Sequence, residues 1–82
     1  MQPYSNNSGK SSVIAYSAGN DYIVVQFPNS AYYKYTYSSA GQSAIEAMKR
    51  YAQKGFGLGT YISTKDTQPD YERKGSSLES VV

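Results

Sequence analysis

The chain has 82 residues and a formal net charge of +2 at pH 7, and it contains no cysteine, histidine or tryptophan. This composition excludes disulfide scaffolds, thiolate nucleophiles, imidazole bases and the usual zinc sites, and it leaves carboxylates, lysines, tyrosines and hydroxyls to do any chemistry. The weak positive charge permits a polyanionic partner but lacks the concentrated basic signature of most nucleic-acid-binding domains.

The hydrophobic pattern predicts one small domain between two polar ends. Residues 1–11 and 66–82 show no hydrophobic period and are expected to be flexible, which leaves residues 12–65 to fold. No apolar run approaches the ~20 residues that span a bilayer, and no basic segment followed by an apolar one begins the chain. We therefore expect a cytoplasmic protein without a membrane or secretory segment.

Three segments of alternating character predict a three-stranded antiparallel meander. They cover residues 13–17, 22–27 and 31–37, and the sequences Ala-Gly-Asn-Asp and Pro-Asn-Ser between them are typical of turns. The third segment holds four of the ten tyrosines around a single lysine. Aromatic residues favour a half-buried pleated surface, so we expect one face of this strand in the core and the other toward water.

The side-chain period of two fixes which residues share a face. A three-residue loop over 28–30 places Val25 opposite Tyr33, whereas a two-residue loop would place Val25 opposite Lys34. A two-residue turn at Gly19-Asn20 likewise places Tyr16 opposite Ile23. The expected core face consists of Ile14, Tyr16, Ile23, Val25, Phe27, Tyr33 and Tyr35. The expected open face carries Tyr22, Val24, Gln26, Tyr32, Lys34 and Thr36.

A helix is predicted over residues 41–53, with Ser38-Ser39 as its N-cap and Lys54-Gly55 at its end. Phe56 and Leu58 are expected to pack back onto the core, and Tyr61-Ile62-Ser63 could add a short fourth strand. The prediction is therefore an α+β fold with one helix across one sheet face. The apolar stripe of the helix is Ala44, Ile45, Met48, Tyr51 and Ala52.

This pattern resembles the KTSC domain, a short module named after the C-terminus of certain lysyl-tRNA synthetases and also found as stand-alone bacterial proteins. The match covers about residues 11–65, and its markers are the Tyr-x-Tyr pair Tyr33 and Tyr35 and the Lys-Gly pair that ends in Gly55. Ser30 stands where the hairpin often has glycine. The family has no established activity, and the resemblance suggests RNA binding only through the synthetase attachment. The motifs are Ser12-Val13-Ile14, Tyr16, Ile23 to Phe27, Asn29, Tyr33-Lys34-Tyr35, Ala52 to Gly55 and Ile62.

The predicted function is a non-enzymatic binding module with RNA as its partner. Tyr22 and Tyr32 on the open face could stack on bases while Lys34 holds a phosphate. Tyr33 and Tyr35 face the core, so packing explains them. A basic rim near the helix C-terminus could assist binding, although the helix dipole favours cations there in any protein. The rim consists of Lys49, Arg50, Lys54 and Lys65.

The main alternative is a homodimer or partner-protein interface on the open face, formed by Tyr22, Val24 and Tyr32. No clustered acid and base suggests an enzyme, and we expect no catalytic residues, metal or cofactor. The glycines at 55, 57 and 59 follow a helix, unlike those of phosphate-binding loops. Asp66 and Asp70 match a metal or acid-base pair in spacing only.

Overall fold

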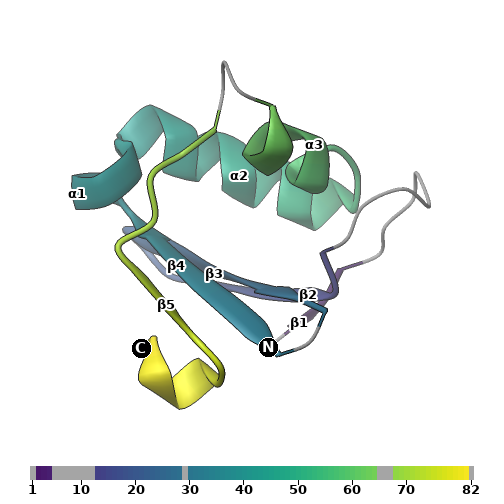
Figure 1. The fold of residues 1–82 in the computed structure, drawn as a ribbon. Helices are drawn as coiled ribbons and strands as arrows, with labels where there is room; N and C mark the ends of the chain where they lie inside the picture. Colours follow the sequence, from purple (N-terminus) through teal and green to yellow (C-terminus); the bar gives the residue numbers. More distant parts are fainter. Residues whose placement is uncertain (1, 5–12, 29, 65–67, 82) are drawn as a thin grey trace.

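The computed structural model describes residues 2–4, 13–28, 30–64 and 68–81. Within these residues the chain forms an α+β fold, in which α-helices cover one face of a five-stranded antiparallel sheet (Figure 1). We call this the helix face and the opposite one the second face. The elements are β1 (Gln2–Pro3), β2 (Ala15–Ala18), β3 (Tyr22–Phe27), β4 (Ala31–Thr36), α1 (Tyr37–Ala40), α2 (Gln42–Lys54), α3 (Leu58–Ser63), β5 (Arg73–Gly75) and the 3-10 helix η1 (Leu78–Ser80).

The register predicted between β3 and β4 is confirmed. Val25 lies opposite Tyr33, Ile23 opposite Tyr35, and Phe27 opposite Ala31. Side chains directly opposite each other in an antiparallel pair share a face, so this row forms one continuous surface. Ile23 and Val25 are completely buried and belong to the core beneath the helices.

The register predicted between β2 and β3 is wrong by two residues. Tyr16 lies opposite Val25 rather than Ile23. The turn lies one residue later than predicted, over Asn20 and Asp21, and the amide of Gly19 donates to the carbonyl of Tyr22 across it at 3.0 Å. A shift of two residues keeps every side chain on its face, so Tyr16 is buried in the core as expected.

Ile14 is 46% exposed, which corrects its expected place in the core, and Val13 is buried instead. Ala15 is the residue paired with Gln26 in the ladder. The amide of the preceding residue, Ile14, nevertheless donates to the carbonyl of Gln26 at 2.8 Å. This contact is one residue out of step with the ladder, and a one-residue slip exchanges the two faces of a strand.

Thr36, rather than Ser38 or Ser39, caps the helical segment. Its hydroxyl accepts a hydrogen bond from the Ser39 amide at 3.1 Å, and the Ser39 hydroxyl accepts one from the Thr36 amide at 3.0 Å. This reciprocal capping box begins the short α1, which ends at Gly41 with φ at 92°. The single helix predicted over 41–53 is therefore preceded by a separate turn of helix.

The apolar stripe and the end of α2 agree with the prediction. Ile45, Met48 and Ala52 are buried against the sheet. At Gly55 the backbone adopts the left-handed conformation with φ at 68°, and its amide donates to the Ala52 carbonyl. The helix-face core consists of Tyr4, Val13, Tyr16, Ile23, Val25, Tyr35, Ile45, Met48, Ala52, Leu58 and Ile62.

The segment after α2 differs from the prediction. Phe56 is 58% exposed, whereas Leu58 is completely buried. Tyr61–Ser63 lies in α3 and forms no fourth strand. The helix buries Leu58 and Ile62 together because side chains four residues apart lie on one side of a helical turn.

Both ends of the chain supply edge strands, which corrects the expectation of flexible segments in the described parts of residues 1–11 and 66–82. β1 pairs with β2, and β5 pairs with β4. The amide of Glu72 donates to the Lys34 carbonyl at 2.7 Å just before β5 begins. Such pairing uses backbone groups alone, so a polar segment can join a sheet without an alternating apolar pattern.

The second face is covered at its centre, which corrects the expected open face. Val24, Val81 and Ala15 are buried, yet none belongs to the helix-face core. Gly75 lies opposite Tyr32 on this face, and a Cβ on Gly75 would collide with the Ser80 hydroxyl. Figure 1 shows η1 on the side of the sheet away from α2 and α3. The C-terminal residues therefore fold closely over the second face.

A candidate tyrosine pocket beside strand β4

A pocket of about 360 Å³ lies beside β4 on the helix face. Its walls come from the β3–β4 hairpin, from the end of α3 and from residues 68–71. Ser63 and Gln68 add polar side chains, and Ile62 adds an apolar one. We call this cavity the tyrosine pocket because four aromatic rings line it, those of Phe27, Tyr33, Tyr35 and Tyr71.

Tyr33 is the centre of this ring cluster. The centroid of its ring lies 5.5 Å from that of Phe27 and 5.0 Å from that of Tyr71, and in both pairs the ring planes are almost perpendicular. The ring of Tyr35 runs nearly parallel to it at 6.4 Å. Edge-to-face and offset parallel arrangements are the favourable ones for aromatic pairs. The ring of Tyr33 is therefore held by three neighbours and forms a firm wall.

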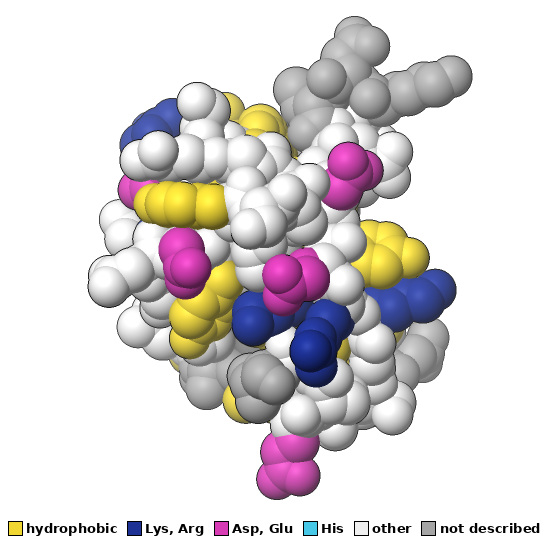
Figure 2. Space-filling view, turned by 90° about the vertical axis from the view of Figure 1, so that its left-hand side faces the viewer, with side chains coloured by type: hydrophobic (Ala, Val, Ile, Leu, Met, Phe, Trp, Pro, Cys, Tyr) yellow, Lys and Arg dark blue, Asp and Glu magenta, His cyan; other side chains and the backbone are white. Residues whose placement is uncertain are grey.

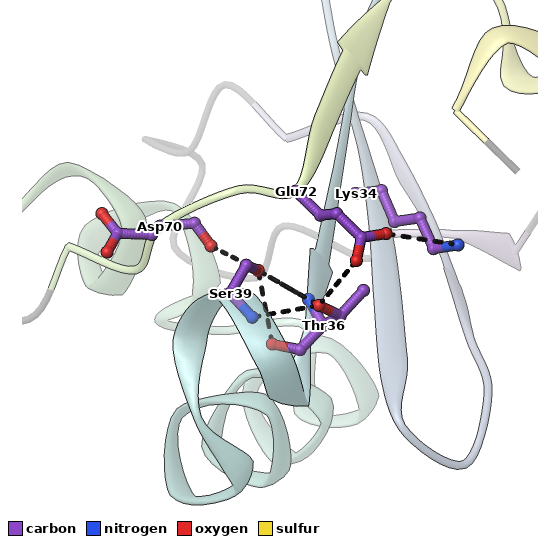
Figure 3. A network of polar contacts seen from close by, with 5 residues as sticks. All are labelled: Lys34, Thr36, Ser39, Asp70 and Glu72. Atoms are coloured by element: carbon purple, nitrogen blue, oxygen red, sulfur yellow. Dashed lines mark hydrogen bonds and ion pairs between the residues drawn. The ribbon is translucent and has the colours of Figure 1, made fainter.

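A network of polar contacts anchors the outer wall of the pocket (Figure 3). The Ser39 hydroxyl donates to the Asp70 carbonyl at 2.8 Å, and the Thr36 hydroxyl donates to the Glu72 carboxylate at 3.4 Å. Lys34 Nζ lies 3.9 Å from the same carboxylate. These contacts tie the segment that carries Tyr71 to the end of β4 and the start of α1.

Burial raises the pKa of the Tyr35 hydroxyl, and the neighbouring Tyr33 and Tyr71 raise it further. The physical cause is that a phenolate would lose its hydration inside the pocket and would lie close to two further phenols. Like any tyrosine at neutral pH, Tyr35 carries its hydroxyl proton and can donate a hydrogen bond. The pocket thus combines flat apolar surfaces with hydroxyl, amide and carbonyl groups.

The platform residues Tyr22, Tyr32 and Lys34 share the second face, as predicted, and each is half-buried. Lys34 is already engaged, because its Nζ lies 5.3 Å from the Tyr22 ring centroid as well as beside Glu72. This lysine is therefore held between the Tyr22 ring and the Glu72 carboxylate and is already paired with an anion. The second face therefore offers a less accessible surface than the sequence predicts.

The basic residues Lys49, Arg50 and Lys54 come from α2, on the other side of the sheet from Lys34. Lys49 Nζ donates to the Asn20 carbonyl at 2.7 Å and to the Glu46 carboxylate at 3.0 Å. Hydrogen bonds from Tyr37 and from Lys49 hold the pKa of Glu46 below its usual range. Lys49 thus has a structural role in fastening α2 to the β2–β3 turn.

The charges do not gather by sign on the end of the molecule that Figure 2 shows, where acidic and basic side chains are interspersed. Among the described residues, no three carboxylates come together in a way that could hold a metal ion. Lys65 and Asp66 lie outside the described residues. Gly55 ends α2, which is a structural role.

Sequence reasoning missed the outer wall of the pocket. Tyr33 and Tyr35 were expected only as core residues, and Tyr35 is indeed 3% exposed, but both rings also line the pocket. Gln68, Pro69 and Tyr71 lie in the segment expected to be flexible. An isolated tyrosine in a polar segment was the one signal in the sequence that could have pointed to them.

Comparisons of the chain with protein-family models, with curated proteins and with solved structures found no match. Within the described ranges, no helix has both the length and the apolar character required to cross a membrane. The geometry of the tyrosine pocket is therefore the basis for inferring a function.

Proposed function

We propose that this chain is a non-enzymatic binding module that holds a flat aromatic group of its partner in the tyrosine pocket. The observation that carries the proposal is the set of four rings around a cavity of about 360 Å³. Small-molecule sites typically have volumes of about 300–1,000 Å³ and combine aromatic walls with a few polar groups. A single planar ring system fits this volume and can stack on the exposed ring of Tyr71.

Single-stranded RNA is the partner that we propose. Proteins recognise such strands by stacking unpaired bases on aromatic side chains, and each stacked base contributes roughly 1–3 kcal/mol. The resemblance to the KTSC domain is part of this proposal, and its two marker tyrosines, Tyr33 and Tyr35, both line the pocket. The binding surface thereby moves from the second face to the edge of the helix face.

Two tyrosine variants separate these surfaces. Tyr71 lines the pocket and is 45% exposed, whereas Tyr32 lies on the second face. We expect Tyr71→Ala to weaken binding of a labelled mixed-sequence RNA about tenfold in an anisotropy titration at low salt. We expect Tyr32→Ala to bind as the wild type does. The reverse pattern would reject the pocket and support the platform of Tyr22, Tyr32 and Lys34. Circular dichroism verifies that both variants are folded.

Self-association or binding of a partner protein is the second candidate. The exposure of Ile14 and Phe56, at 46% and 58%, favours it because each presents a large apolar side chain to water. Val24 cannot take part, since it is fully buried within a single chain. Sedimentation velocity over a range of concentrations tests the homodimer, and Phe56→Ser should shift the distribution toward the monomer. A single monomeric species at every concentration would reject it.

A further inference from the structure

We infer that the tyrosine pocket recognises a nucleotide, with the base inside the pocket and the phosphate on Lys74. This inference rests on the proposed function, because it names the side chain that holds the phosphate next to the bound base. Its basis is the position of one cation relative to two of the rings that line the pocket.

Lys74 lies in β5 directly opposite Tyr33 of β4. Cross-strand partners share a face, so the lysine side chain leaves the strand on the side of the pocket. Its Nζ lies 5.9 Å from the centroid of the Tyr71 ring. Lys74 therefore stands beside two rings of the pocket while remaining exposed to solvent.

Glu72 and Asp70 lie near β5, but their carboxylates do not neutralise the charge of Lys74. The carboxylate of Glu72 faces Lys34 and Thr36. Asp70 contributes its backbone carbonyl to the anchoring network, and Figure 3 shows its carboxylate directed away from that network. An exposed lysine at the rim of an aromatic cavity is suited to an anion that is attached to a flat ring.

A nucleotide has this combination of groups. Its base is planar and carries donors and acceptors along its edge, where the hydroxyl of Tyr35 and the side chains of Ser63 and Gln68 can meet them. Its phosphate is one sugar away from the base, so a base in the pocket brings the phosphate to the rim. Free nucleotides and nucleotides within an RNA strand share this chemistry.

Arg73 and Lys74 form a matched pair for testing the inference. They are adjacent in β5, both are exposed, and both carry a positive charge, but they lie on opposite faces. Arg73 lies opposite Lys34 on the second face, whereas Lys74 lies opposite Tyr33 on the pocket side. Removal of either side chain changes the net charge equally, so a difference between the variants reports position rather than total charge.

The experiment compares adenosine with adenosine 5′-monophosphate in amide NMR titrations of the full chain. For the wild type we expect both to shift residues of the pocket and the monophosphate to bind about threefold to fivefold more tightly at low salt. Lys74→Ala should abolish this preference without weakening adenosine binding, and Arg73→Ala should retain it.

A short single-stranded RNA forms the third arm. If the RNA binds more tightly than the monophosphate, the ligand of the pocket is a nucleotide within a strand. If the monophosphate binds more tightly, the ligand is a free nucleotide.

The failures of the two proposals are distinguishable. Equal affinities of adenosine and its monophosphate, with shifts confined to the pocket, would overturn the phosphate role of Lys74 and leave the binding module in place. Equal losses of preference in the two variants would also overturn it, because the effect would then come from net charge. Shifts confined to the second face, or none with any of the three ligands, would reject the pocket itself.

Discussion

The two faces of the sheet are buried by different means. On the helix face, α2 and α3 cover a continuous row of apolar side chains that includes Ile23 and Val25. On the second face the buried apolar side chains are Ala15, Val24 and Val81, and η1 folds over β5. A polar C-terminal segment can thus close a sheet face that the sequence pattern would leave open.

The two covers also decide where a binding site can form. The centre of each face is packed, and the tyrosine pocket lies at an edge of the sheet where two covers meet. The tyrosine pocket is such a place, because α3 ends beside it and residues 68–71 pass its outer side. Among the rings of the pocket, Tyr35 belongs to the helix-face core, whereas Tyr71 comes from the segment at the edge of the sheet.

Truncation of Tyr35 should have the largest effect on stability. The side chain is 3% exposed in the helix-face core, so Tyr35→Ala should lower the free energy of unfolding by roughly 3 kcal/mol. Urea denaturation followed by circular dichroism measures this loss. Tyr35→Phe keeps the ring and should lose less than half as much. A loss below about 1 kcal/mol for the alanine variant would show that the ring contributes little to the core.

The cover of the second face is tested by Val81→Ala. Because Val81 is completely buried, we expect a loss of about 1.5–2 kcal/mol in the same assay. Glu79→Ala, at an exposed position of η1, should change the free energy of unfolding by less than about 0.5 kcal/mol. If both variants unfold like the wild type, the C-terminal segment does not stabilise the second face, and the contrast between the faces is lost.

Alkaline unfolding tests the burial of the Tyr35 hydroxyl. Its pKa is raised in the folded state, so the associated stability is fully present below the ordinary tyrosine value of 10.0 and is lost as pH rises above it. Between pH 10 and 12, the titration of Tyr35 should lower the free energy of unfolding by as much as about 1.4 kcal/mol per pH unit. The slope should be shallower in Tyr35→Phe, whose side chain does not titrate. Identical slopes in the two proteins would place the hydroxyl in water.

The smallest effect concerns the β3–β4 hairpin that forms one side of the pocket. Ser30 adopts a positive φ of 59°, a conformation that suits glycine. We expect Ser30→Gly to raise the free energy of unfolding by about 0.5 kcal/mol, because relief of backbone strain exceeds the added entropy of the unfolded chain. Ser38→Gly, at an exposed helical position, should be destabilising by about the same amount. Destabilisation by Ser30→Gly would show that the serine is not strained.

The sequence predicts the parts of the fold whose side chains follow a period. The β3–β4 register follows from the alternation around Val25 and Tyr33, and the buried face of α2 follows from Ile45, Met48 and Ala52. The place of Ile14 does not follow, because a local slip in pairing changes its face. The strand at 73–75 does not follow either, since backbone pairing carries no side-chain signature.

The candidate site could be predicted only in part for the same reason. The alternation assigns Tyr33 and Tyr35 correctly to the helix face, and both line the pocket. Tyr71 reaches them only because Glu72 and Asp70 are fastened to β4 and α1 from far along the chain. Such a long-range contact is set by geometry, which one sequence read in short windows does not contain.

An NMR titration of the full chain with a mixed single-stranded RNA at low salt tests the central claim most directly. We expect the largest shifts to fall on the pocket, at Phe27, Tyr33, Ser63 and Tyr71, and to weaken as salt is added. Shifts concentrated instead on Tyr22, Tyr32 and Lys34 would contradict the claim that the tyrosine pocket is the binding site. The absence of any shift up to millimolar RNA would contradict RNA as the partner.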